Sequence, residues 1–473
     1  GRTALHLNTT GGYNTAVGMN ALYNNTTASN NTAVGYNALL TNTTGTRNAA
    51  LGQSALEANT TGNYNVAVGS LSLTDNTTGS LNTACGDVAL YVNTTGDQNT
   101  AVGQQALYQN TTANYNTAVG HKSLWANTTG ERNVAVGLEA LEANTTSNYN
   151  TAVGSYALTA NTGAWNTAVG DASLAGNTTG SNNCAFGQQA LYLNTTANDN
   201  SAFGHKALWK NTTGQFNVGV GVSALQANTT GDKNIAIGVR ALSANTTADN
   251  NIAIGYQSLD ANTTGTRNTA LGDSALGASN ADDNTAVGYH ALVTNTTGAM
   301  NVAVGDHALD ANTTGSHNTA IGAYALTENT TASNNTAIGR ATLTQNTTGT
   351  QNTALGRGAL DSNTTASNNT AVGYYALEAN TTADGNTGVG MQALMNNTTG
   401  TLNTAVGTGA LQANTTTGDC VAVGYQALLA STNAYNTAVG AYAAYTNTTG
   451  TRNTCIGRTA LHLNTTGGYN TAV

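Results

Sequence analysis

Two pairs of acidic residues are the strongest candidates for catalytic chemistry in this sequence. Asp361 and Glu378 are separated by the same interval as Asp232 and Asp249. Two carboxyl groups on one face are the arrangement with which polysaccharide-degrading enzymes split a glycosidic bond. Asp361 and Glu378 are 17 residues apart. Nearby residues that continue this spacing are Tyr, Thr, Gln or Ala, and they supply no third polar partner for the two carboxyl groups. We therefore interpret both pairs as surface carboxylates and predict no catalytic residue.

The histidines and cysteines show no spacing typical of a zinc site. The seven histidines are scattered, and His121 and His205 are copies of each other within a duplicated block. No cysteine has a second cysteine one repeat away; the four are Cys85, Cys184, Cys420 and Cys455. We expect no disulfide framework, and we predict no metal site and no cofactor.

The tripeptide Asn-Thr-Thr occurs at 25 of 28 equivalent places and matches the acceptor pattern for N-glycosylation. The candidate glycan carriers are the first five copies, which begin at Asn8, Asn25, Asn42, Asn59 and Asn76. The alternative is turn chemistry, because Asn and Thr side chains bond to nearby backbone groups and shape a corner.

Tyrosine and tryptophan side chains are confined to variable positions of the sequence. One such position holds the candidate surface-contact residues Tyr23, Tyr108, Trp125, Tyr192 and Trp209. Outward aromatic residues commonly serve interfaces. The alternative is that they cover the surface and stabilise the fold by stacking on one another.

All these residues belong to one repeat, N-T-A-V-G-x-x-A-L-x-x-N-T-T-G-x-x, whose positions we number one to seventeen. From Asn14 to Asn470 the repeat recurs in 24 steps of this full length and in three steps that are one residue shorter. A β-branched run that glycine interrupts in every repeat cannot keep a helical period. Short apolar runs between Gly and Asn are instead typical of strands.

The repeat predicts an all-β parallel β-solenoid, or β-roll, of about 27 coils, because one coil cannot bury its apolar face alone. We expect two short strands per coil, near positions one to four and seven to ten. Coils would stack about 4.8 Å apart, with Asn at positions one and twelve forming amide ladders along the stack.

The composition of the chain indicates its domain organisation. Only 7% of the residues are charged, proline is absent and no linker interrupts the repeat, so we expect residues 1–473 to form one continuous solenoid rod. The net charge of −9 and the lack of a basic patch argue against nucleic-acid binding.

Residues 1–17 are identical to 457–473. We interpret this as a 456-residue super-repeat and expect a window of a longer array that continues end to end.

The strand pattern also predicts a partner. Positions two, three and four are all small or apolar, although neighbouring residues of a strand point to opposite faces. One face can line the coil, and we expect the other to pack laterally against further copies of the chain.

The motif Asn-Thr-Ala-Val-Gly, with the variants Asn133–Gly137 (Asn-Val-Ala-Val-Gly) and Asn234–Gly238 (Asn-Ile-Ala-Ile-Gly), resembles the repeat of the YadA-like heads of trimeric autotransporter adhesins. Similar arrays occur in phage tail fibres. The resemblance covers the whole chain, although the family repeat is shorter. It implies a left-handed β-roll, a trimer of chains side by side, a cell-surface location and an adhesive role.

We therefore expect a non-catalytic, structural extracellular filament of a microbe or virus that acts in adhesion or cell contact. Its partners would be further copies of itself and cell-surface glycans, with no nucleic acid and no membrane span in this stretch. A phage tail-fibre shaft involved in receptor binding is the first alternative. A β-helical polysaccharide-degrading enzyme is the second.

Overall fold

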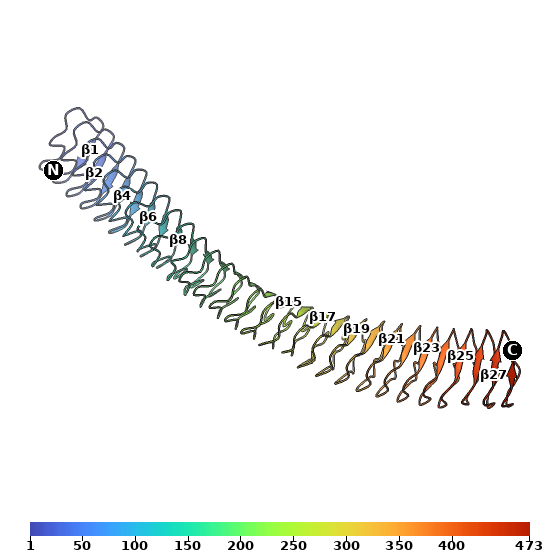
Figure 1. Cartoon of the computed structure of the whole chain (residues 1–473). Coiled ribbons are helices and arrows are strands. Elements are labelled where there is room, and N and C mark those ends of the chain that lie inside the picture. Colours follow the sequence, from blue (N-terminus) through green and yellow to red (C-terminus); the bar gives the residue numbers. More distant parts are fainter. The chain divides into compact units, whose positions relative to one another are not determined.

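The chain is an all-β parallel β-solenoid with a 17-residue period, as the repeat predicted. The computed structural model describes residues 1–473, which form two compact units, Gly1–Asn234 and Ile235–Val473. Within each unit the strands follow one another in sequence order (Figure 1). The 17-residue repeat runs through both units, and their union in one continuous rod stays a prediction.

Each coil contributes one strand of two or three residues, and there is no helix. The strands of the first unit are β1 Thr15–Val17, β2 Thr32–Val34, β3 Ala49–Leu51, β4 Val66–Val68, β5 Thr83–Cys85, β6 Thr100–Val102, β7 Thr117–Val119, β8 Val134–Val136, β9 Thr151–Val153, β10 Thr167–Val169, β11 Cys184–Phe186, β12 Ser201–Phe203 and β13 Val218–Val220. Those of the second unit are β14 Ile235–Ile237, β15 Ile252–Ile254, β16 Thr269–Leu271, β17 Thr285–Val287, β18 Val302–Val304, β19 Thr319–Ile321, β20 Thr336–Ile338, β21 Thr353–Leu355, β22 Thr370–Val372, β23 Thr387–Val389, β24 Thr404–Val406, β25 Val421–Val423, β26 Thr437–Val439, β27 Thr454–Ile456 and β28 Thr471–Ala472.

Neighbouring strands pair in parallel with each repeat position opposite its own copy. In β21 and β22, for example, Ala354 lies opposite Ala371 and Leu355 opposite Val372. The 16-residue coils keep this register, since Thr151 of β9 still pairs with Thr167 of β10. The residue lost from a short coil is therefore absorbed in its turns and not in its strand.

The prediction of a second strand at positions seven to ten is wrong. The backbone φ is positive at positions seven and nine, with 57° at Asn20 and 51° at Leu22, whereas a strand requires a negative φ. The Tyr23 N–H donates to the Asn20 carbonyl at 3.2 Å, and the Leu22 N–H donates to Ala38 of the next coil at 3.0 Å. This segment is thus a series of tight turns that still bonds to the adjoining coil.

The interior of each coil is filled by positions three, eight and nine. Ala33, Ala38 and Leu39 are completely buried, and the corresponding residues of the other internal coils are buried in the same way. The side chain at position three therefore points inward. Positions two and four, on either side of it in the strand, point outward.

The predicted asparagine ladders are present and are buried. At position twelve, Asn42 Nδ2 donates to Asn25 Oδ1 at 3.0 Å and to the Gly45 carbonyl at 2.9 Å. At position one, Asn31 Nδ2 donates to the same Gly45 carbonyl at 2.9 Å, and its Oδ1 accepts the Asn48 N–H at 2.9 Å. The ladders supply the partners that buried backbone groups at a corner need.

Candidate functional site

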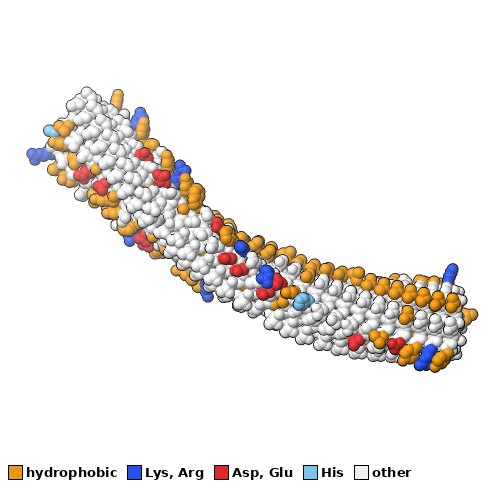
Figure 2. Space-filling model, in the orientation of Figure 1, with side chains coloured by type: hydrophobic (Ala, Val, Ile, Leu, Met, Phe, Trp, Pro, Cys, Tyr) orange, Lys and Arg blue, Asp and Glu red, His pale blue; other side chains and the backbone are white.

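Within each unit the outward side chains of positions two and four form a continuous surface, which we call the strand face. In β21, Thr353 is exposed, Ala354 is buried and Leu355 is 44% exposed. The register places each of these residues beside its copy in the next coil. No charged residue occupies either position in any of the 28 strands. Figure 2 shows the result as a lengthwise row of hydrophobic side chains over the C-terminal coils.

The aromatic residues predicted to contact a partner lie in stacks along the coils. Tyr108 stacks on Trp125 with ring centroids 6.2 Å apart and an interplanar angle of 13°. Tyr23 stacks on His6 at 5.1 Å. Tyr23, Tyr108 and Trp125 are half-buried, and the indole Nε1–H of Trp125 is buried without a hydrogen-bond partner. These stacks agree with the alternative that the aromatic residues stabilise the fold by stacking on one another. Contact of these residues with a partner stays a prediction.

The second pair of predicted contact residues has the same geometry. Tyr192 stacks on Trp209 at 6.4 Å, and the Nζ atoms of Lys206 and Lys210 lie 5.6 and 5.7 Å from the Trp209 ring centroid. Tyr192 also borders a surface cavity of about 470 Å³. The cavity lies beside the first 16-residue coil and is lined by Tyr156, Thr159, Asp171, Ala172, Ala175, Gly176, Tyr192 and Leu193.

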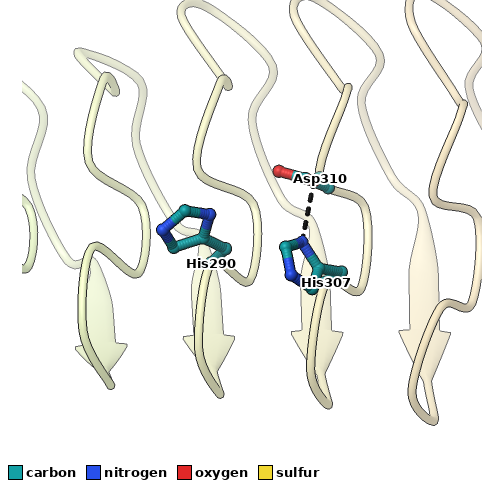
Figure 3. A group of neighbouring side chains, drawn as sticks. All are labelled: His290, His307 and Asp310. Atoms are coloured by element: carbon teal, nitrogen blue, oxygen red, sulfur yellow. Dashed lines mark hydrogen bonds and ion pairs between the residues drawn. The ribbon is translucent and has the colours of Figure 1, made fainter.

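The structure brings together two histidines and an aspartate that the sequence analysis left apart. His290 and His307 occupy position seven of consecutive coils in the second unit, and Asp310 follows at position ten of the latter coil. Ligand atoms of all three lie within 4.8 Å of one another, and all three side chains are half-buried (Figure 3). His307 Nδ1 and Asp310 Oδ2 form a hydrogen bond of 2.9 Å.

Neighbouring side chains hold the two imidazole rings in place. Tyr289 stacks on His290 at 4.0 Å, and Tyr324 stacks on His307 at 5.7 Å. The carboxylate of Asp306 lies 3.9 Å from His307 Nε2. The site thus combines two imidazoles, one hydrogen-bonded carboxylate and a second carboxylate nearby.

The interpretation of the histidines as scattered is wrong for His290 and His307. In the zinc motifs that are recognised by spacing, the paired ligands lie a few residues apart in one local segment. In a solenoid, residues one period apart are neighbours, and these two histidines are separated by a single full period. The signal that identifies the cluster is therefore a histidine repeated at the period, followed three residues later by a carboxylate.

The two predicted carboxylate pairs have different environments. Burial and the negative charge of Asp361 raise the pKa of Glu378, so these two groups are electrostatic neighbours. Asp232 accepts the Gln215 N–H at 2.7 Å and completes a coil corner. It belongs to the first unit, whereas Asp249 belongs to the second. Asp361 and Glu378 are therefore shown to act on each other.

The asparagines predicted to carry glycans are mostly buried and hydrogen-bonded. Asn25, Asn42, Asn59 and Asn76 are completely buried, and the Nδ2 atom that would carry a glycan donates to the ladder, as in Asn59 to Asn42 Oδ1 at 2.8 Å. Asn8 is half-buried, and its Nδ2 donates to the Gly11 carbonyl at 3.0 Å. The four buried asparagines are thus bonded as the turn-chemistry alternative requires, while glycosylation stays a prediction.

No family model matches the chain, and no curated protein matches it in sequence. None of its elements is a long apolar helix of the kind that crosses a membrane.

Proposed function

We propose that the chain is a non-catalytic structural fibre protein that associates laterally with further copies of itself through the strand face. The assembled fibre would act outside the cell, at a cell or virion surface, in adhesion or cell contact. The observation that carries the proposal is the strand face, which is uncharged in every coil and consists of apolar, threonine and, once, serine side chains.

The first argument is that parallel sheets are rarely left bare. Parallel strands occur almost only where both faces of the sheet are covered. Here position three of each strand packs inside the coil, while position four remains partly exposed, as in Val406 at 37%. A contiguous exposed apolar patch on a soluble protein marks an interaction site. Covering the face stabilises an assembly by about 25 cal/mol per Å² of apolar surface buried.

The second argument concerns which partner fits. The strand face repeats one rung at a time, about 4.8 Å apart. A second copy of the chain has the same repeat, so its side chains stay in step over many coils. If a partner has a different repeat distance, its side chains no longer align with those of the strand face after a few rungs. Self-association, in three copies if the adhesin-head resemblance extends to assembly, therefore fits this surface best.

Charge substitutions on the strand face test the proposal. Leu355→Lys, Val372→Lys and Val389→Lys together place three like charges on adjacent rungs, which opposes burial of the face without altering the coil interior. The matched control is Tyr374→Lys, Met391→Lys and Thr408→Lys, which charges position six of three consecutive coils. We expect the wild type and the control to assemble, and the strand-face variant to have a mass near the chain mass of 47.6 kDa.

Light scattering and sedimentation velocity would measure these masses. A wild type that sediments as a single chain over the accessible concentration range would contradict lateral association. So would equal loss of assembly in the strand-face variant and the control. Binding of the assembled wild type to a glycan array would test the adhesive role separately.

A polysaccharide-degrading enzyme is the second candidate function, and one observation favours it. The pKa of Glu378 is raised by burial and by Asp361, and a raised carboxyl pKa is a property of the general acid in glycosidases. Polysaccharide cleavage that disappears in Asp361→Asn would support this candidate and contradict the structural proposal. A phage tail-fibre shaft would use the strand face in the same way as the proposed surface fibre.

A further inference from the structure

We propose that His290, His307 and Asp310 bind one divalent transition-metal ion of borderline softness, with Zn²⁺, Cu²⁺ and Ni²⁺ as the fitting ions. The inference concerns a local site and does not depend on the proposed function. Imidazole suits zinc, copper and nickel, and Asp oxygen also ligates Zn²⁺. The three side chains supply two nitrogen ligands and one oxygen ligand, so a four-coordinate ion would take its fourth ligand from water.

The distances are close to those of a bound site. Zinc–nitrogen and zinc–oxygen bonds are about 2.0–2.2 Å long, which puts two ligand atoms of a tetrahedral site roughly 3.3 Å apart. His307 Nδ1 and Asp310 Oδ2 are 2.9 Å apart, so they already lie at about the separation of two ligands on one ion. All ligand atoms lie within 4.8 Å of one another. Separations of up to 4.8 Å exceed the separation of two ligands on one ion, so binding requires the ligand atoms to move closer together.

The backbone positions the two imidazoles in the same way. His290 and His307 both have a φ of 53° at position seven. The His307 N–H donates to the Tyr289 carbonyl of the preceding coil at 3.0 Å, which fixes the separation of the two coils at this point. Equivalent backbone geometry in adjacent coils projects both rings to the same side of the stack, as Figure 3 shows. Pre-organised ligands lose little conformational freedom when they bind an ion.

The surrounding groups favour a cation. Asp310 and Asp306 both lie beside His307, at 2.9 Å from Nδ1 and 3.9 Å from Nε2 respectively. Together they bring two negative charges to the site, which offsets the charge of a divalent ion. Stacking by Tyr289 and Tyr324 limits ring motion. If the three residues bind no metal, the cluster is a surface histidine–aspartate hydrogen bond. The experiment must distinguish this hydrogen bond from a metal site.

Metal titration of the 473-residue chain tests the site. Cys85→Ser serves as the background, because the exposed Cys85 thiol is a competing zinc ligand. Zn²⁺ is titrated by calorimetry into this protein and into His290→Gln, His307→Gln and Asp310→Asn made in the same background. His317→Gln is the matched control, since His317 is an exposed histidine of the same coil as His307. We expect one Zn²⁺ per chain, at least a tenfold loss of affinity in each site variant and no loss in the control.

Nickel broadening of histidine resonances identifies the ligands directly. With ring-labelled histidine the chain gives one signal for each of its seven histidines, and the two glutamine variants assign His290 and His307. We expect substoichiometric Ni²⁺ to broaden these two signals first. Parallel broadening of all seven signals, or equal Zn²⁺ affinity in His317→Gln and the site variants, would overturn the proposal.

Discussion

At the scale of single residues, the buried corners of the coil depend on the amides at positions one and twelve. In the full-length coils a position-twelve asparagine typically uses one nitrogen for two acceptors, the preceding asparagine and a carbonyl three residues on, as Asn363 does with Asn346 and Ala366. Two rows of amides therefore satisfy backbone groups that no strand ladder reaches. Where Ser279 replaces the asparagine, its hydroxyl still accepts a hydrogen bond of 3.2 Å from Asn295.

Removing one amide from a ladder should destabilise the coil locally. Asn363→Ala leaves Asn346 Oδ1 without its donor and removes the Oδ1 acceptor of Asn380 Nδ2, whereas the Ala366 carbonyl still accepts from Asn352 Nδ2. An unsatisfied buried polar group costs about 1–3 kcal/mol. Ser362→Ala, at the half-buried neighbouring position, is the control and should be nearly neutral. Amide hydrogen exchange around this coil measures the difference, and equal protection in the two variants would refute the role of the ladder.

A titration at Glu378 gives a second prediction at this scale. Burial and the charge of Asp361 raise the pKa of Glu378 in the folded chain. A raised pKa stabilises the fold below the unfolded pKa, and this contribution is lost as pH rises through the folded pKa. Glu378→Gln should therefore raise the free energy of unfolding slightly near pH 7, by less than about 1 kcal/mol because the carboxyl group keeps solvent contact, and not near pH 3. Chemical denaturation of the wild type and of Glu378→Gln at pH 3 and pH 7 measures the difference, and an equal effect of the substitution at the two pH values would contradict the prediction.

At the scale of the coil, part of the structure follows from the sequence and part does not. The period, the parallel register and the asparagine ladders could be predicted, because each requires only that a residue type recurs once in every coil. The turns at positions seven to ten could not, since leucine rarely adopts a positive φ, yet Leu22 does so at 51°. The stacked coils impose this conformation, and it leaves no local signal in an Ala-Leu pair.

The candidate site was missed for a related reason. His290 and His307 are ordinary variable residues until the register puts position seven of one coil beside position seven of the next. The sequence also did not show which side chains of the strand point into the coil, because Thr353, Ala354 and Leu355 are all suited to burial. Only the packed coil shows that Ala354 points inward and that the other two form the strand face.

The glycine at position five sets how closely two coils approach. Gly373 has a φ of 138°, and a Cβ added there would lie 2.5 Å from the Gly390 carbonyl oxygen of the next coil. Gly373→Ala should destabilise the fold by more than about 1 kcal/mol, because neither the conformation nor the space suits alanine.

Gly12→Ala is the matched control, since a Cβ at Gly12 meets nothing within 4 Å. Thermal unfolding of the two variants compares them. A Gly373→Ala chain as stable as Gly12→Ala would show that the coils can separate without cost.

At the scale of the whole molecule, the repeat leaves few positions free and assigns each a direction. The charged, tyrosine and tryptophan side chains occupy outward variable positions, and none of the charged side chains lies on the strand face. This division explains how a chain with 7% charged residues and no proline can fold, since most positions serve ladders or coil interiors and proline would remove a ladder donor. It also leaves one uncharged surface on every coil, which the proposed assembly covers.

The most direct test of this assembly is the cross-section of the native particle by electron cryo-microscopy, in which β-rolls can be counted. We predict more than one roll in each section, with the outward residues at positions two and four turned toward a neighbouring roll. Single rolls whose strand face meets only solvent would contradict lateral association and the structural role inferred from it.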